Sequence, residues 1–500
     1  MMSELLTHQD YMAIAEQLKV PTQSFINGQY CDAISGRTYP TTNPATGEQL
    51  ALISACDAQD VDKAVAAAKQ AFENGGWSQL HPNERKHILQ AFGQLVLQHT
   101  NELAVMECLD SGKPISDCVT IDVPEFVHTV NWHAEAIDKI YDQTAPVGNE
   151  AMAMIVREPV GVVGAVLPWN FPMLMLGWKI APALAAGCSV VVKPAEQTSL
   201  TALRLAELAS AAGIPDGVFS VVTGGGAEVG EPLGRHADVD MVTFTGSTVT
   251  GRRFLNYSAE SNLKKVVLEL GGKNPCVVLN DAEHLDKIAQ HICSAAFWNM
   301  GENCSAASRL IVQSGIKPQL MTHILTALKE WQMGCPLNPD NQLGAMIDRR
   351  HYDKVMSYIQ LGKEKGYTLL AGGESRDGVY IEPTIFDGVD NQDQIAQEEI
   401  FGPVLSVITV DSVEEALRVA NETSYGLAAS LFTTSNGAAL RAARAIKAGT
   451  VTVNCFGEGD ITTPFGGYKQ SGFGGRDNSV HAHDQYTELK TIWVDMTHDL

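Results

Sequence analysis

"GVVGAVLPWNFPMLMLGWKIAPALAAGCSVVV", residues 161–192, is the stretch that decides the fold. It is long and nearly uncharged, and a membrane span needs about 20 continuous apolar residues. Here the run is interrupted by Pro168, Asn170, Pro172, Lys179 and Pro182. We therefore expect a strand, a proline-bounded turn, a buried helix and a second strand. Two strands joined by a helix predict a right-handed parallel crossover and an α/β fold.

The same alternation continues on the C-terminal side of this stretch. "GVFSVVTG" and "VDMVTFTGS" follow as strands with helical patterns between them, and a second alternating block begins near residue 271 with "NPCVVLN". We expect two α/β domains with a boundary around "LELGGKN". Near the C-terminus, "ELKTIWV" is predicted to be a strand with no evident partner nearby, and it could pair with another subunit.

Composition narrows the class of protein. A chain of 500 residues with 45% hydrophobic and 19% charged residues can form two or three domains. The formal net charge of −23 argues against nucleic acid or anionic membranes as partners, and it weakly suits a cationic small substrate. The 10 cysteines show no zinc-like spacing, so no metal site is predicted. The N-terminus lacks a signal-peptide pattern, so we expect a cytoplasmic protein with reduced thiols.

Three residues are candidates for chemistry. Cys304 lies among small residues in "NMGENCSAAS", residues 299–308, which suggests a nucleophile, although a small buried cysteine beside a helix end is the alternative. Glu269 ends an apolar strand, where desolvation would raise its pKa and make it a base; a strand-end glutamate turned to water is the alternative. Asn170, held between two prolines, can supply an oxyanion-hole amide or belong to a simple turn.

Three further stretches suggest dinucleotide binding, each with a solvated loop as the alternative. "TGGGAEVG", residues 223–230, follows a strand and opens a helix, but it is not a G-x-G-x-x-G fingerprint. "VVVKPAEQ" places Lys193 and Glu196 just past a strand end, where they can contact ribose or phosphate. "FTGS", residues 244–247, is another turn at a strand end.

Together these stretches resemble the aldehyde dehydrogenase superfamily over nearly the whole chain. Seven motifs occur in order: "PWNFP" at 168, "KPAEQT" at 193, "FTGST" at 244, "LELGGK" at 268, "GENCSAASR" at 301, "EEIFGPV" at 398 and "PFGGYKQSG" at 464. Within the superfamily the likeness is to the group that oxidises ω-aminoaldehydes, such as gamma-glutamyl-gamma-aminobutyraldehyde in putrescine catabolism. "EPVGVVGAVLPWNFPMLMLGWK" and "GDITTPFGGYKQSG" carry that likeness.

The resemblance implies a catalytic role for four residues. Cys304 would attack the aldehyde to give a thiohemiacetal, and the side-chain amide of Asn170 with the Cys304 backbone N–H would hold the oxyanion. After hydride transfer to NAD, Glu269 would activate the water that hydrolyses the thioester. Lys179 matches a family lysine near the oxyanion and the proton path, although a helix lysine that reaches the surface is the alternative.

The resemblance also implies the cofactor contacts. Lys193 and Glu196 match adenine-ribose contacts, and the carboxylate would repel a 2′-phosphate, which favours NAD over NADP. The remaining predicted cofactor residues are Leu167, Trp169, Gly226, Gly230, Gly246, Ser247, Glu399 and Phe401. Gly226, Gly230, Gly246 and Ser247 match the phosphate-side turns, and Glu399 and Phe401 match the grip on the nicotinamide ribose and ring.

The substrate contacts rest on aromatic and acidic residues. The predicted set is Phe171, Trp178, Trp298, Glu458, Asp460 and Phe465. Two acids in "FGEGDITTPF" could attract an amine-bearing tail, with cation–π contacts from the aromatics; a solvated acidic loop is the alternative. The motifs that contain these predicted substrate residues have no arginine to bind the carboxylate of succinic semialdehyde, which weighs against that substrate. Two departures from the family pattern are Glu302, where glutamine is frequent, and Asp477, where a glutamate is frequent.

The implied fold has three parts: a Rossmann-like NAD-binding domain (1–140 and 160–270), an α/β catalytic domain (271–470) and a small β oligomerisation element (141–159 and 471–500). A homo-oligomer, dimer or tetramer, is expected. The main alternative is a broad-specificity or betaine-aldehyde dehydrogenase. A CoA-acylating enzyme, a catalytically silent protein that kept the fold and a cofactor-free cysteine hydrolase also remain open. Formation of NADH, and its dependence on CoA, separates these alternatives.

Overall fold

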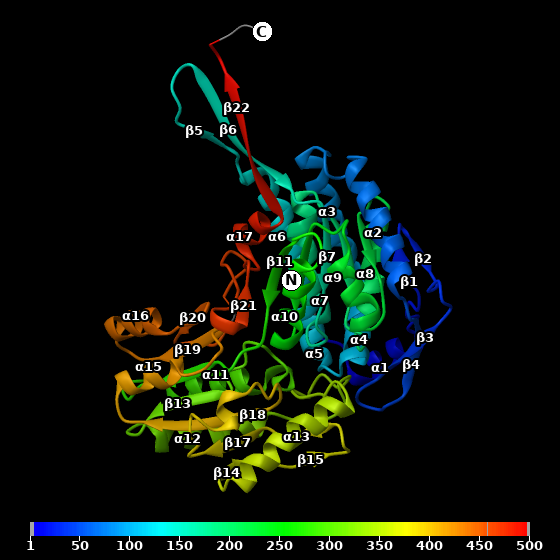
Figure 1. Cartoon of the computed structure of the whole chain (residues 1–500). Helices are drawn as coiled ribbons and strands as arrows, with labels where there is room; N and C mark the ends of the chain where they lie inside the picture. The colour runs from blue at the N-terminus through cyan, green and yellow to red at the C-terminus, as the bar shows by residue number, and fades with distance from the viewer. Residues whose placement is uncertain (1–4, 458, 498–500) are drawn as a thin grey trace.

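The computed structural model describes residues 5–457 and 459–497, which form two sheets covered by helices and a projecting β arm (Figure 1). The first sheet has the order β2-β1-β9-β8-β7-β10-β11-β21. Its strands are β1 (Ser24–Ile26), β2 (Gln29–Cys31), β7 (Val162–Val166), β8 (Ser189–Lys193), β9 (Phe219–Val221), β10 (Met241–Thr245), β11 (Lys265–Glu269) and β21 (Gly472–Phe473). The five strands β9-β8-β7-β10-β11 run parallel. Their order is that of a Rossmann fold, with the topological switch point between β7 and β10.

The deciding stretch folds as expected into β7, helix α7 (Pro172–Ala186) and β8. Every residue of α7 is buried, which explains a helix that is apolar on all sides. Pro172 begins the helix, where its missing N–H costs nothing. Gly187 ends it in the left-handed conformation with φ of 101°. No helix among the described residues is long and apolar enough to span a membrane.

Helices pack on both faces of the first sheet. They are α1 (His8–Gln17), α2 (Ala58–Glu73), α3 (Pro82–Gln98), α4 (Thr100–Ser111), α5 (Ile115–Asp117), α6 (Val123–Ala136), α8 (Leu200–Ala211), α9 (Glu231–Arg235) and α10 (Thr248–Ala259), with π-helical turns at Cys118–Asp122 and Gly226–Gly230 and a 3₁₀ turn at Ile137–Lys139. The larger core lies on the α7 face, with Trp77, Phe92 and Phe126 buried in it. A hairpin of β3 (Thr38–Thr42) and β4 (Gln49–Ser54) lies beside this body.

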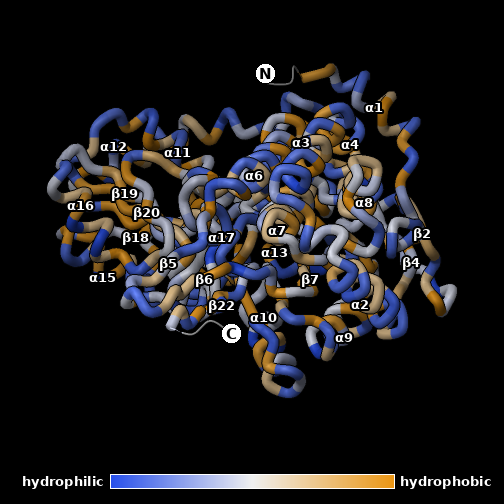
Figure 2. Tube along the Cα trace, turned by 90° about the horizontal axis from the view of Figure 1, so that it is seen from above, coloured by the Kyte–Doolittle hydropathy of each residue, from blue (hydrophilic) through white to orange (hydrophobic). Residues whose placement is uncertain are grey.

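The second sheet has the order β14-β17-β18-β13-β12-β19-β20. Its strands are β12 (Pro275–Val278), β13 (Arg309–Gln313), β14 (Thr368–Ala371), β17 (Thr384–Asp387), β18 (Val404–Val410), β19 (Ala428–Phe432) and β20 (Thr450–Val453). The accompanying helices are α11 (Leu285–Phe297), α12 (Lys317–Ala327), α13 (Arg349–Glu364), α14 (Gln394–Gln397), α15 (Val413–Asn421) and α16 (Asn436–Ala445). Three 3₁₀ turns (Trp298–Gly301, Leu328–Glu330, Lys469–Ser471) and a hairpin of β15 (Ser375–Arg376) and β16 (Tyr380–Ile381) complete it. Hydrophobic positions gather in its inner strands, as in β18 and β19 (Figure 2).

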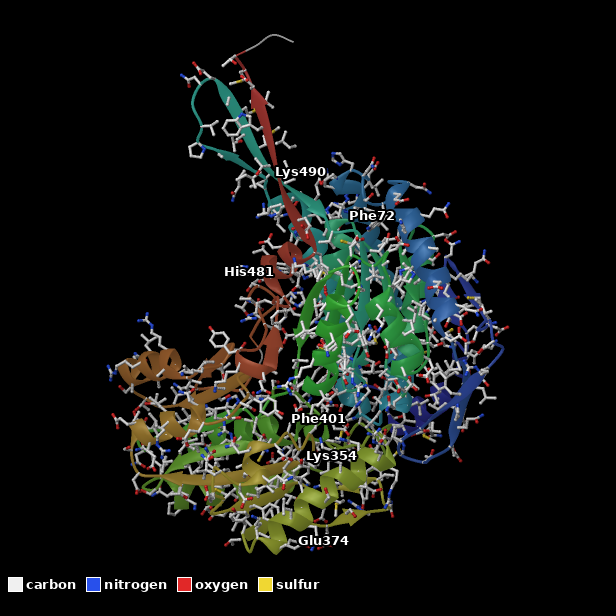
Figure 3. All side chains as sticks on the ribbon, viewed as in Figure 1. Phe72, Lys354, Glu374, Phe401, His481 and Lys490 are labelled. Atoms are coloured by element: carbon white, nitrogen blue, oxygen red, sulfur yellow. The ribbon has the colours of Figure 1, made fainter. Side chains whose placement is uncertain are left out.

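The chain passes from the first sheet to the second between Glu269 and Pro275, which is where "LELGGKN" lies. The expected α/β fold with two parallel-rich sheets is therefore confirmed. A cavity lies between these two bodies, near Phe401 and Lys354 (Figure 3).

The projecting arm contains β5 (Gln143–Ala145), β6 (Ala151–Pro159) and β22 (Thr487–Asp495), with α17 (Ser479–Gln485) before the last strand. The expectation that the C-terminal strand lacks a partner nearby is wrong, because β22 pairs antiparallel with β6 from Thr487↔Pro159 to Asp495↔Ala151. The edge of β22 away from β6 carries no strand among the described residues. Residues 472–473 do not belong to the arm, since β21 pairs with β11 in the first sheet.

Candidate active site

A cavity of about 180 Å³ lies at the carboxyl ends of β7, β10 and β11, closed on its other side by the second domain. This edge of the sheet is its topological switch point, where open α/β sheets bind ligands. The cavity brings together the following predicted residues: Trp169, Asn170, Gly246, Ser247, Glu269, Cys304, Glu399 and Phe401. It also contains residues that the sequence did not suggest, namely Met175, His351 and Lys354. The described residues include no cluster of three or more side chains suited to a metal ion.

Cys304 lies in the turn after the 3₁₀ segment and is half-buried. Asn299 and Met300 turn the chain through left-handed conformations with φ of 51° and 55°. The Cys304 carbonyl accepts a hydrogen bond of 2.8 Å from the side-chain amide of Asn274. A Cβ on Gly272 would lie 2.4 Å from that carbonyl oxygen, so only glycine fits there. The small-residue surroundings therefore fix the backbone of the thiol while leaving its side chain at the cavity.

Asn170 is buried and held from both sides. Its Nδ2 donates to the Glu302 carbonyl at 2.9 Å, and its own backbone carbonyl accepts from Asn299 Nδ2 at 3.1 Å. An amide nitrogen carries two N–H groups, so one remains for an oxygen in the cavity. A rigidly held donor is what stabilisation of a developing oxyanion requires.

Glu269 is 4% exposed, and neither of its carboxyl oxygens has a hydrogen-bond partner among the described residues. Burial, and secondly the nearby Asp477 carboxylate, raise the pKa of Glu269 well above its usual range. A carboxyl group that is buried and unpaired can take up a proton near neutral pH. The Glu269 side chain therefore does not face solvent, and its position in the cavity suits a general base.

Lys179 and Asp477 form a fully buried ion pair behind Glu269. The Lys179 ammonium lies 2.6 Å from Asp477 Oδ2, and both side chains are 0% exposed. Lys179 therefore does not reach the surface. The shorter acid at position 477 still reaches the lysine, and its Oδ1 has no hydrogen-bond partner among the described residues.

Glu302, the other departure from the family pattern, faces away from the thiol. Its Oε1 accepts from the Ile347 N–H at 3.1 Å, and the His351 ring lies 3.7 Å away. Burial raises the pKa of Glu302 well above its usual range. Its side chain therefore links the cysteine turn to the loop before α13, while its carbonyl orients Asn170.

One wall of the cavity is aromatic. The rings of Trp169 and Phe401 meet edge to face at 5.3 Å, and Phe401 adopts φ of 62°. The His351 ring contacts both, its Nε2 lies 2.6 Å from the Phe401 carbonyl, and burial lowers the pKa of His351 to about 4.

Glu399 accepts from the Gly272 N–H at 2.9 Å, and Lys354 donates to the Glu399 carbonyl at 3.0 Å. His351 and Lys354 lie on α13, an amphipathic helix without a motif, so the sequence carried no signal for them.

The other predicted cofactor residues lie outside this cavity. They are Leu167, Lys193, Glu196, Gly226 and Gly230. Leu167 follows β7, and Lys193 ends β8, where its ammonium pairs with Glu196 at 3.0 Å. A Cβ on Gly226 or Gly230, at the two ends of the helical turn, would meet no atom of another segment within 4 Å. A dinucleotide is long enough to need both this edge and the cavity.

The predicted substrate residues gather on the opposite side of Cys304. Phe171, Trp178 and Phe465 are buried in one apolar cluster, against which Trp298 and Cys304 pack. Phe171 and Trp298 have ring centroids 5.1 Å apart, and Trp178 and Phe465 5.2 Å apart.

A second cavity, of about 320 Å³, adjoins these rings. Its lining includes Trp178, Trp298, Asp460 and the acid Glu125. Asp460 is exposed and accepts a hydrogen bond of 2.6 Å from the Thr462 hydroxyl. Glu458 lies outside the described residues. The cavity thus has aromatic walls near the thiol and acids towards its mouth.

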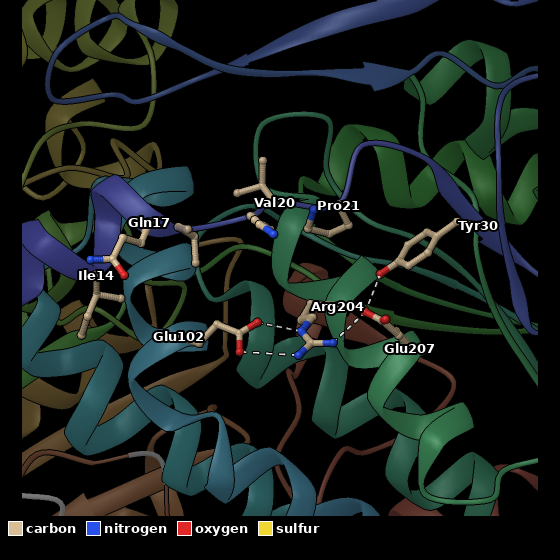
Figure 4. A pocket seen from close by; sticks show the side chains of 10 residues that line it. Ile14, Gln17, Val20, Pro21, Tyr30, Glu102, Arg204 and Glu207 are labelled. Atoms are coloured by element: carbon tan, nitrogen blue, oxygen red, sulfur yellow. Dashed lines mark hydrogen bonds and ion pairs between the residues drawn. The ribbon is translucent and has the colours of Figure 1, made fainter.

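A larger hollow of about 550 Å³ lies elsewhere, against the N-terminal segment (Figure 4). Its polar centre is Arg204, which pairs with Glu102 at 2.7 Å and with Glu207 at 2.6 Å. Tyr30 also donates to Glu207. It contains none of the predicted site residues, and its central charges, Arg204, Glu102 and Glu207, are paired with one another.

The comparison with known proteins agrees with this geometry. A family model described as "Aldehyde dehydrogenase family" matches residues 30–492. An "Aminoacetaldehyde dehydrogenase" from Pseudomonas aeruginosa is 62% identical over 494 residues, covering 99% of this chain and 100% of the relative. The "NADP/NAD-dependent aldehyde dehydrogenase PuuC" of Escherichia coli is 45% identical, covering 96% and 97%.

Solved structures superpose over almost the whole chain. The indole-3-acetaldehyde dehydrogenase AldA of P. syringae, determined in complex with NAD⁺, has a TM-score of 0.97 and 47% identity, covering 98% of this chain and 100% of that one. The gamma-glutamyl-gamma-aminobutyraldehyde dehydrogenase of Burkholderia cenocepacia has a TM-score of 0.96 and 48% identity, with the same coverage.

Proposed function

The chain belongs to the aldehyde dehydrogenase family, and on that basis we propose that it oxidises an ω-aminoaldehyde to the corresponding acid, with NAD as hydride acceptor. The observation that carries the proposal is the cavity in which Cys304, Asn170 and Glu269 meet Glu399 and Phe401. A nucleophile, an oxyanion donor and a base thereby share one space at the switch point of a Rossmann-type sheet.

The reaction begins at the thiol. The Cys304 thiolate sulfur forms a bond to the aldehyde carbon as the carbon–oxygen π bond breaks, and the resulting oxyanion accepts hydrogen bonds from the Asn170 side-chain N–H and the Cys304 backbone N–H. NAD, when bound, accepts the hydride that leaves this carbon. Trp169, Phe401 and Glu399 would hold the nicotinamide end, whereas Lys193 and Glu196 would contact the adenosine ribose. Loss of the hydride leaves an acyl thioester on Cys304.

Hydrolysis then needs a base. Glu269 takes a proton from water, the hydroxide adds to the thioester carbon, and the Cys304 thiolate leaves as the acid is released. Because burial raises the pKa of Glu269, its carboxylate is a stronger base than an exposed one. The Lys179–Asp477 pair lies next to it and can move the proton away from the cavity.

The substrate class rests on the second cavity. Aromatic rings near the thiol suit an aldehyde with a cationic tail, and the exposed acids at the mouth add a weaker attraction that solvent screens. The names of two relatives point the same way: one is an aminoacetaldehyde dehydrogenase and the other a gamma-glutamyl-gamma-aminobutyraldehyde dehydrogenase. We place the reaction in polyamine catabolism in the cytoplasm. A broad-specificity enzyme is the less favoured alternative.

The same proposal covers domains and assembly. We assign 1–140 and 160–270 to NAD binding, 271–470 to catalysis, and the arm of β5, β6 and β22 to oligomerisation as a homotetramer. The support is that no strand among the described residues pairs with the outer edge of β22, and that Leu489 and Trp493 on this strand are exposed.

The experiment is NADH formation with a panel of aldehydes. The panel holds gamma-aminobutyraldehyde, its gamma-glutamyl derivative, betaine aldehyde, succinic semialdehyde and pentanal, with Cys304→Ala as the inactive control. The proposal predicts that the primary-amine aldehydes have the highest kcat/KM and that Cys304→Ala forms no NADH. A lead for pentanal would refute the substrate class, and activity in Cys304→Ala would refute the mechanism.

A further inference from the structure

Asp117 stands out among the acids near the substrate cavity because it bonds to an aromatic ring of the tunnel. It ends α5, directly before the π-helical turn Cys118–Asp122. Its Oδ2 accepts a hydrogen bond of 3.0 Å from the indole Nε1 of Trp298, 181 residues later in the chain. Asp117 itself is half-buried and does not line the cavity, so it lies behind the ring. π-Helical turns inside helices frequently occur at functional sites.

Trp298 connects this carboxylate to the reaction centre. Its ring lines the 320 Å³ cavity, packs at a tilt against Phe171 with ring centroids 5.1 Å apart, and contacts the same apolar cluster as Cys304. An indole N–H has only a donor role, and a carboxylate is its strongest acceptor. The bond fixes the plane of the ring and pushes electron density towards its face, which strengthens attraction for a cation.

Among the acids close to Trp298, Asp117 is the one whose charge is not offset by an ion pair among the described residues. Lys113 lies over the neighbouring aromatic ring, with its ammonium 4.2 Å from the centre of the Phe171 ring. That ammonium is 2.7 Å from Asp122, and both side chains are 1% exposed, so the two charges offset each other. Burial raises the pKa of the neighbouring Glu107 to about 8, so this acid is largely neutral at neutral pH.

We propose that Asp117 is a positioning and specificity-determining residue: through the Trp298 indole it makes this ring the seat for the ammonium group of a short aminoaldehyde whose carbonyl reaches Cys304. The inference rests on the proposed function and deepens it. It differs from attraction by Glu125 and Asp460, because those acids lie at the mouth, where water and salt screen them.

The test compares two substrates of equal length, 3-aminopropanal and butanal. The first ends in an ammonium group and the second in a methyl group. The readout is the ratio of their kcat/KM values at pH 8, where Asp117 is mostly ionised, in the full-length enzyme with saturating NAD. Asp117→Asn keeps an oxygen that accepts from the indole but removes the charge. We expect the ratio to fall about tenfold, with kcat/KM for butanal within about twofold of wild type.

Two further variants separate the possible causes. Glu125→Gln removes one charge at the mouth and should change the ratio by less than about twofold. Trp298→Phe keeps a ring but lacks the N–H, and in this background Asp117→Asn should have almost no further effect, as a double-mutant cycle requires.

The pH dependence gives a readout that a purely structural role would not move. Burial, opposed by Lys113 and assisted by Asp122, raises the pKa of Asp117 to about 7. The wild-type ratio should therefore rise between about pH 6 and pH 8, while the ratio of Asp117→Asn stays flat. Effects on Cys304 and Glu269 cancel in the ratio because both substrates share them.

Each outcome decides between the two claims. A wild-type ratio near one refutes the proposed substrate class, and the inference falls with it. A high wild-type ratio that Asp117→Asn retains refutes only the inference. An equal loss for butanal and 3-aminopropanal, or an equal change in Glu125→Gln, would also overturn it, because the role would then be structural or a general effect of charge.

Discussion

Replacing Asp477 with asparagine tests the electrostatics behind the general base. The substitution keeps a hydrogen-bond acceptor for Lys179 but leaves its fully buried ammonium without a counter-charge. Breaking a buried pair in this way costs about 3–5 kcal/mol. Unfolding entropy of about 2.1 cal/mol/K per residue amounts to about 1 kcal/mol/K for this chain, so Tm should fall by about 3–5 °C.

The same substitution should change catalysis. Burial and then Asp477 raise the pKa of Glu269, whereas Lys179 lowers it. Without the Asp477 charge, and with the Lys179 charge unopposed, the pKa of Glu269 falls. Deacylation after acetylation of Cys304 by 4-nitrophenyl acetate reports this step without NAD. Its acid limb should therefore move to lower pH in Asp477→Asn.

Thermal unfolding and the pH profile of deacylation measure the two effects separately. The double variant Lys179→Met, Asp477→Asn removes the unpaired ammonium and should recover part of the lost Tm. An unchanged Tm in Asp477→Asn, or an acid limb that moves to higher pH, would refute this reasoning.

Two other predictions concern Glu269 and Glu196. The pKa of Glu269 is higher in the folded than in the unfolded chain, so its ionisation destabilises the fold as pH rises above about 4.3. Glu269→Gln should therefore be more stable than wild type at pH 8 and lose this advantage towards pH 4, measured as Tm against pH; an advantage that grows on acidification would contradict it. Glu196→Ser removes the carboxylate that opposes a 2′-phosphate, so kcat/KM with NADP should rise about tenfold relative to NAD. Unchanged selectivity would show that Glu196 does not contact the ribose.

Local sequence patterns were enough to predict the elements of the fold. Residues 161–192 contain apolar runs of strand length, a proline-bounded turn and an apolar helix ended by Gly187, and each of these signals is local. The candidate residues Cys304, Glu269 and Asn170 were found through short motifs, and the structure places them around one cavity.

Contacts between distant segments were not predictable in the same way. Lys179 and Asp477 are 298 residues apart, and Asp117 and Trp298 are 181 residues apart. Periodicity and turn chemistry say which residues are buried in an element, but not which distant element they meet. The resemblance grouped 141–159 with 471–500, but no local pattern identified β6 as the strand that pairs with β22. His351 reaches the site from an amphipathic helix whose pattern has a purely structural explanation.

The central claim is that Cys304 carries an acyl group which Glu269 helps water to remove. The most direct measurement is the mass of the Glu269→Gln protein after incubation with 3-aminopropanal and NAD. The account predicts one burst of NADH per subunit and an added mass equal to the aldehyde less two hydrogens, located by peptide mapping on Cys304 and absent in Cys304→Ala. Undiminished steady-state turnover with no adduct on Cys304 would contradict it.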